Sequence, residues 1–98
     1  MVESYANLIA AVSANSAKLR KDIPEVMQGF NAMALSVAAR CDPCIGYHAK
    51  ALVKFGATRA EVEEMLGMCV YMGGGPSLMY AAAAIAAYEE FGGERAAA

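Results

Sequence analysis

Apolar residues recur at three- and four-residue spacings along most of the chain, which is the period of an amphipathic α-helix. No run alternates apolar and polar residues in the manner of a half-buried strand, and no hairpin turn stands out. The pattern therefore predicts an all-α fold. We expect a single helical domain over residues 1–98, built from about five helices.

Residues that favour helix starts and stops divide the chain into the predicted helices. Their expected ranges are roughly 3–20, 24–40, 42–54, 58–72 and 76–91. Asp22 is expected to cap the second helix and Pro24 to lie in its first turn, while Asp42 and Pro43 do the same for the third. A glycine-rich turn separates the last two helices.

The apolar faces of these helices indicate what they bury. Residues 32–39, in the second helix, are apolar almost all round, which predicts that this stretch is buried. Thr58 and Glu61 have the spacing of a capping box at the start of the fourth helix, and Cys69 falls on its apolar face as an inert thiol. Residues 92–98 show no pattern and are expected to fray.

Composition adds an expectation about assembly. Of the 98 residues 58% are apolar, which is more than a domain of this size easily hides from water. We therefore expect part of this surface to face other copies of the chain. Residues 65–88 carry no charge and are long enough to cross a bilayer, but Gly73–Pro76 would break such a helix. Two helices joined by a turn are favoured over a membrane span.

Charge and cysteine usage narrow the class of protein. The net charge is −2 with acidic and basic residues mixed, and there is no Trp, so nucleic acid is not an expected partner. The first residues lack the basic and apolar regions of a signal peptide. Three cysteines without such a signal indicate a reducing compartment, and we expect a cytoplasmic protein.

The candidate chemistry lies in residues 41–48, which read CDPCIGYH. Cys44 falls in the first turn of the predicted third helix, where free N–H groups and the helix dipole stabilise a thiolate. His48 follows four residues later on the same helix face and can exchange a proton with it. Cys41 precedes the helix and can close a disulfide with an oxidised Cys44. These three residues are the predicted catalytic set.

Two other interpretations of the same residues stay open. Cys41, Cys44 and His48 supply three zinc ligands, with Cys69 as a distant fourth. Alternatively, the cysteines and the histidine are ordinary core residues. The redox interpretation is favoured and requires no cofactor and no metal. Tyr47 and Tyr71 could reach a substrate, but packing is the expected role of both.

Beyond these local signals, residues 39–81 resemble the alkylhydroperoxidase D-like family, which is grouped with the carboxymuconolactone decarboxylases. A CxxCxxxH motif, a GAT-x-x-E helix start and an MGGGP turn occur together in the family's order. The resemblance implies an all-helical fold that assembles as homotrimers or homohexamers. It also implies a peroxide-reducing site in which Cys44 forms the sulfenic acid, Cys41 is the proton donor and resolving thiol, and His48 belongs to the proton relay.

The chain departs from the family at one position. Family members carry a Lys-Glu pair about three helical turns before the first cysteine, and the Glu joins the relay. Twelve positions before Cys41 stands Gly29, preceded by Gln28, and Glu25 is out of register. The segment that precedes the cysteine helix is also shorter than in the family. His48 therefore has no orienting carboxylate that the sequence can identify.

Together these observations predict a thiol-dependent oxidoreductase that reduces a hydroperoxide or a disulfide, with a dithiol as electron donor. Two alternatives stay open. The chain could be a non-redox oligomeric binding protein, as the missing Glu suggests. It could also be a lyase of the carboxymuconolactone decarboxylase type that acts on a small carboxylate, with His48 as base and a cation such as Arg40 in the pocket.

Overall fold

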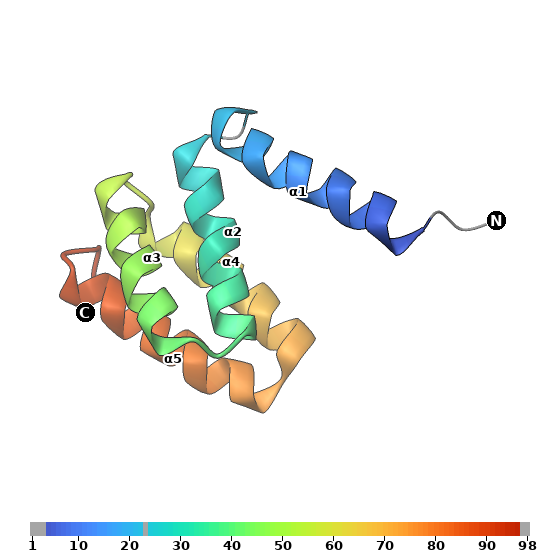
Figure 1. The fold of residues 1–98 in the computed structure, drawn as a ribbon. Helices are drawn as coiled ribbons and strands as arrows, with labels where there is room; N and C mark the ends of the chain where they lie inside the picture. Colours follow the sequence, from blue (N-terminus) through green and yellow to red (C-terminus); the bar gives the residue numbers. More distant parts are fainter. Residues whose placement is uncertain (1–3, 23, 97–98) are drawn as a thin grey trace.

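The chain folds as five α-helices, four of which pack together (Figure 1). The computed structural model describes residues 4–22 and 24–96, and no strand occurs in these ranges. The helices are α1 (Tyr5–Asp22), α2 (Glu25–Ala38), α3 (Asp42–Lys54), α4 (Arg59–Gly73) and α5 (Gly75–Glu90). The predicted all-α class is confirmed, and the predicted boundaries lie within about two residues of these. Glu3, the expected start of the first helix, lies outside the described residues.

The capping signals were only partly predictive. The Thr58 capping box is confirmed, since Thr58 Oγ1 accepts from Glu61 N at 3.2 Å and Glu61 Oε1 accepts from Thr58 N at 2.9 Å. Asp42 is not an N-cap, because the extended backbone of Cys41 starts α3 one residue earlier and makes Asp42 the first helical residue. Asp22 belongs to the end of α1, and Pro24 takes the N-cap position of α2.

The core lies where α2, α3, α4 and α5 meet. Its largest fully buried side chains are those of Tyr88, Met33, Leu52, Val37 and Val62. Each helix contributes to this core through one face only. The prediction that residues 32–39 are buried all round is therefore wrong. Leu35, which lies on the opposite side of α2 from the core, is 69% exposed.

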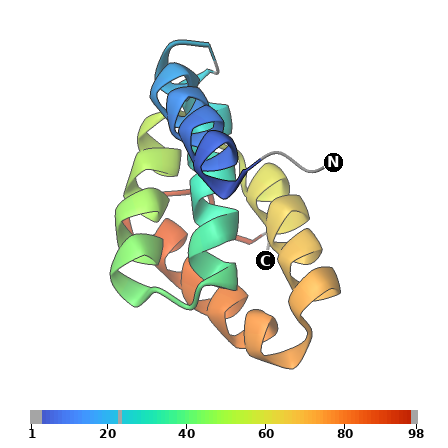
Figure 2. The same cartoon turned by 45° about the vertical axis from the view of Figure 1, so that its right-hand side comes forward.

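Helix α1 stands apart from this core. It extends away from the other four helices in Figure 1, and in the turned view of Figure 2 it lies foreshortened in front of the upper end of α2. The residues Tyr5, Leu8, Ile9 and Val12 form an apolar stripe along α1 that is exposed, while the side chain of Leu19 lies outside the described residues. The chain thus carries an apolar helix face that its own described residues do not cover.

A glycine turn separates α4 from α5. Gly74 adopts φ +72°, a conformation that favours glycine, and serves as the end of α4 and the start of α5. Pro76 follows in the first turn of α5. The uncharged stretch is therefore two helices, and within the described residues no helix has both the length and the apolar character that a membrane span requires.

Glu94 and Arg95 contact other parts of the chain, so the expectation that the residues after α5 fray is wrong for these two, while residues 97–98 lie outside the described residues. The Tyr88 hydroxyl donates to the Ala57 carbonyl at 2.7 Å and accepts from Glu94 N at 3.2 Å. Gly93 lies so close to the Tyr88 ring that a Cβ there would be 2.4 Å from it. The Glu94 carboxylate accepts from Arg59 N at 3.2 Å. The segment thus ties the end of α5 to the loop between α3 and α4.

We expect Tyr88→Phe to lower the free energy of unfolding by about 1–2 kcal/mol, because it leaves the Ala57 carbonyl without its buried donor. Urea denaturation followed by circular dichroism measures this change. Tyr71→Phe is the control, since Tyr71 is 82% exposed, and its effect should stay below about 0.5 kcal/mol. Equal effects of the two substitutions would contradict the role assigned to Tyr88.

Candidate functional site

A tight turn between α2 and α3 positions the two predicted active cysteines. Arg40 N donates to the Val37 carbonyl at 3.1 Å, and Cys41 N donates to the Ser36 carbonyl at 3.0 Å. These two bonds are those of a Schellman motif, in which the residue after the cap adopts a left-handed conformation. Here that residue is Arg40, with φ +58°, where glycine is usual. The turn delivers Cys41 directly to the start of α3.

Cys41 and Cys44 are joined by a disulfide, and their Cα atoms lie 5.2 Å apart. Cys41 is the N-cap of α3, and its Sγ accepts a hydrogen bond from Cys44 N at 3.3 Å. Pro43 lies between them in the first turn. Both cysteines are half-buried. The structure thus brings the pair together at the positive end of a helix, where negative charge on either sulfur is stabilised.

His48 lies on α3, one turn after Cys44 and half-buried. Its ring contacts the Tyr47 ring edge to face, with centroids 5.1 Å apart. Among the described residues the imidazole has no hydrogen-bond or ion-pair partner. The spacing from Cys44 agrees with a role in proton transfer, but no neighbouring group orients the ring.

The position of the missing family Glu faces α3. Gly29 is buried on α2, and a Cβ built on it would lie 3.0 Å from Cδ2 of Leu52. Leu52 is one helical turn beyond His48 on α3. A side chain at position 29 would therefore meet Leu52, which already fills the space between the two helices there. Glu25 is exposed at the far end of α2 and does not replace the absent carboxylate.

The remaining candidate residues lie elsewhere. Tyr47 and Tyr71 are 74% and 82% exposed, so neither is packed into the core of this chain, and Tyr47 contacts the neighbouring His48 ring. Cys69 is half-buried on α4 and its Sγ lies 3.8 Å from the Ala34 carbonyl oxygen. Burial raises the pKa of this thiol. In the described part of the chain, no three His, Cys, Asp or Glu side chains are arranged to hold a metal ion.

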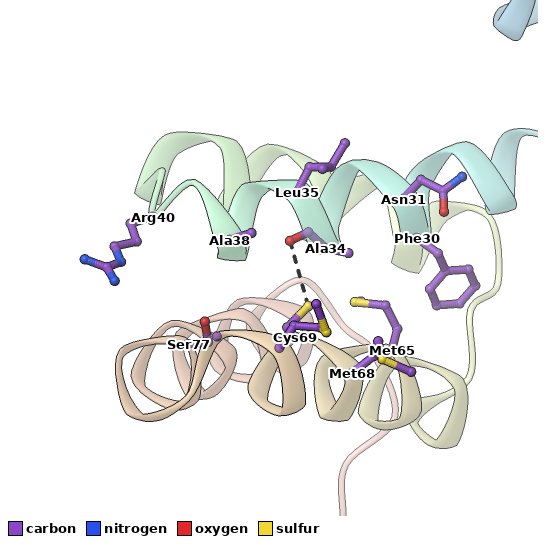
Figure 3. Close-up of a pocket in the computed structure, with 12 residues that line it drawn as sticks. Phe30, Asn31, Ala34, Leu35, Ala38, Arg40, Met65, Met68, Cys69 and Ser77 are labelled. Atoms are coloured by element: carbon purple, nitrogen blue, oxygen red, sulfur yellow. Dashed lines mark hydrogen bonds between the residues drawn. The ribbon is translucent and has the colours of Figure 1, made fainter.

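A groove of about 650 Å³ lies between α2 and α4 (Figure 3). Phe30, Leu35 and the methionines 65, 68 and 72 form its apolar walls, and Arg40 and Ser77 also line it. The groove, and the part that Met68 and Met72 play in it, were not predicted from the sequence. The four-residue spacing of those two methionines was the signal that could have indicated it.

We expect the reduced protein to show two reactive thiols and one slow thiol. Because burial raises the pKa of Cys69, its thiolate fraction at pH 7 is below that of an exposed cysteine, and its alkylation by iodoacetamide should accelerate as the pH rises. Mass spectrometry of the alkylated peptides measures each rate, with alkylation in guanidinium as the reference. Equal rates for Cys69 in the folded and unfolded protein would contradict this assignment.

Similarity to known proteins agrees with this architecture. The chain is 36% identical over 67 residues to an uncharacterized protein from Cupriavidus necator, a match that covers 68% of this chain and 59% of that relative. It is 50% identical to a carboxymuconolactone decarboxylase family protein from Legionella pneumophila, whose apo crystal structure superposes with a TM-score of 0.73. That match covers 88% of this chain and 79% of the other. The sequence profile of the carboxymuconolactone decarboxylase family matches residues 4–87, which confirms the resemblance seen in the sequence. The chain therefore belongs to the carboxymuconolactone decarboxylase family.

Proposed function

We propose that this chain is a thiol-dependent oxidoreductase that reduces a hydroperoxide or a disulfide through Cys41 and Cys44. The observation that carries the proposal is the position of the bonded pair, at the first turn of α3 with His48 one turn later. Two cysteines that are close enough to form a disulfide can alternate between the dithiol and the disulfide. Cys44 is the proposed nucleophile, Cys41 the resolving thiol and His48 the proton relay.

The proposed oxidation has two steps. The Cys44 thiolate attacks one oxygen of the hydroperoxide, the O–O bond breaks, and the alcohol leaves after taking a proton from His48 or Cys41. Cys44 is then a sulfenic acid. The Cys41 thiolate attacks the Cys44 sulfur, the disulfide forms, and the sulfenic hydroxyl leaves as water after protonation. Two electrons have passed from the thiol pair to the peroxide.

A dithiol donor completes the proposed cycle. One thiolate of the donor attacks Cys44, and Cys41 leaves as a thiolate. Cys41 is suited to be the leaving group, because its Sγ already accepts the Cys44 N–H at 3.3 Å and that bond strengthens when the sulfur is charged. The second donor thiol then releases Cys44 and leaves with its own disulfide closed. Such a donor, and the cytoplasm as its compartment, belong to the proposal.

One observation favours a second candidate function. Gly29 stands where the resemblance implies a relay carboxylate, and His48 has no orienting partner among the described residues. A site without proton relay could be idle, and the chain would then act as a binding protein whose copies associate. The uncovered apolar face of α1 supports such self-association, as a trimer or a hexamer, under either function.

The reduced protein should consume cumene hydroperoxide with the loss of two thiols for each cumyl alcohol formed. Cys44→Ser should abolish this reaction, because it removes the proposed nucleophile. Cys69→Ser should leave it unchanged, since Cys69 is held against α2 and takes no part in the cycle. Thiol titration together with chromatography of the alcohol measures both sides of the stoichiometry.

Two outcomes would contradict the proposal. If wild type and Cys44→Ser consume the peroxide alike, the thiol pair is not the reactive site. If the reduced wild type is inert to cumene hydroperoxide and to a disulfide such as lipoamide, the binding function is favoured instead. An activity on small carboxylates that survives loss of both cysteines would indicate the lyase alternative.

A further inference from the structure

The groove between α2 and α4 has the size and lining of a small-molecule site. Its volume of about 650 Å³ falls in the range of ligand pockets, and Met65, Met68 and Met72 line it along one side. Methionine side chains adapt to the shape of an apolar ligand. Leu35 and Met68 are 69% and 62% exposed, so this apolar surface is not covered by the described part of the chain.

One end of the groove is polar. Figure 3 shows Arg40 and Ser77 at the same end, with Phe30 and Asn31 toward the other. Ser77 is only 7% exposed, and its hydroxyl has no hydrogen-bond partner among the described residues. No fully buried side-chain oxygen among the described residues lacks a partner, so the Ser77 oxygen keeps some access to solvent and can bond a ligand in the groove that it lines. Gly73 makes room for this hydroxyl, because a Cβ at that position would lie 1.9 Å from the Ser77 oxygen.

Arg40 supplies positive charge at this end. Among the described residues that line the groove it is the only charged one, and it forms no ion pair within the described chain. Its φ of +58° is unfavourable for a side chain of this size, and glycine would be less strained there. A strained residue that glycine could replace is an indication that its side chain has a role.

We propose that this groove binds a monocarboxylate with an unbranched alkyl chain. The carboxylate would contact the Arg40 guanidinium and the Ser77 hydroxyl, and the alkyl chain would lie along the methionines. A guanidinium pairs well with a carboxylate, whereas an alkylamine would be repelled. Neither Cys41 nor Cys44 lines the groove, so this inference does not rest on the proposed thiol reaction.

Isothermal titration calorimetry with dodecanoate, below its micelle concentration, tests the proposal on the intact chain. Dodecan-1-ol and dodecyltrimethylammonium provide the same chain with a neutral and a cationic head. We expect dodecanoate to bind about tenfold more tightly than the alcohol, as a charged hydrogen bond allows, and the cation to bind most weakly.

Substitutions separate the ligand contacts from folding. Arg40→Gly suits the backbone of the turn, so it should keep or raise the melting temperature while weakening dodecanoate about tenfold and leaving the alcohol unchanged. Met68→Glu places a negative charge in the groove and should abolish dodecanoate binding. Met79→Glu is the matched control, because Met79 is 71% exposed on α5 and does not line the groove.

Three results would overturn the proposal. Equal affinity for dodecanoate and dodecan-1-ol would show that the groove binds only the alkyl chain and does not recognise the carboxylate. Unchanged dodecanoate affinity in Arg40→Gly would remove the carboxylate contact. Binding that appears only after Ile9→Glu, a change in the exposed stripe of α1, would assign the groove to the α1 helix of a second copy.

Discussion

Two backbone hydrogen bonds at the end of α2 fix the turn on which both candidate sites depend. Arg40 N and Cys41 N donate to the carbonyls of Val37 and Ser36, two residues that are buried in the core. The two hydrogen bonds therefore fix the backbone conformation between the end of α2 and the start of α3. Cys41 emerges from the turn as the N-cap of α3, and the Arg40 side chain reaches the end of the groove. An Arg in this left-handed conformation costs about 1 kcal/mol that glycine would save.

Local sequence signals predicted the helices and the cysteine pair well, because both depend on residues close together in the chain. The Thr58 capping box and the Cys41–Cys44 pair each span four residues and need no tertiary information. The predictions that failed were those of burial, which depends on which helix faces pack against one another. Leu35 fits a buried pattern, yet none of the described helices covers its side of α2. The apolar stripe of α1 also fits a buried pattern and is also exposed. The contacts of the last residues could not be predicted either, since they centre on the buried hydroxyl of Tyr88, which bonds the distant Ala57 carbonyl as well as the nearby Glu94 N.

The proposed thiol site resembles that of the alkylhydroperoxidase D-like family, with one residue different. Family membership accounts for the helical fold, and the structure adds the closed disulfide at the start of α3. At Gly29 the chain offers no side chain, and Leu52 fills the space that faces this position. Any catalysis must then rely on the helix N-terminus and on an unoriented imidazole. The positive end of α3 is thus the main source of thiol activation in this account.

The reactivity of Cys44 as the only thiol tests that claim most directly. In a Cys41→Ser, Cys69→Ser variant, the rate of alkylation by iodoacetamide is measured against pH in the folded protein and in guanidinium. Serine is a good N-cap, so α3 should keep its start. The account predicts that the rate reaches half its maximum at a lower pH in the folded protein than in the unfolded one. A midpoint that is equal or higher in the folded protein would contradict it.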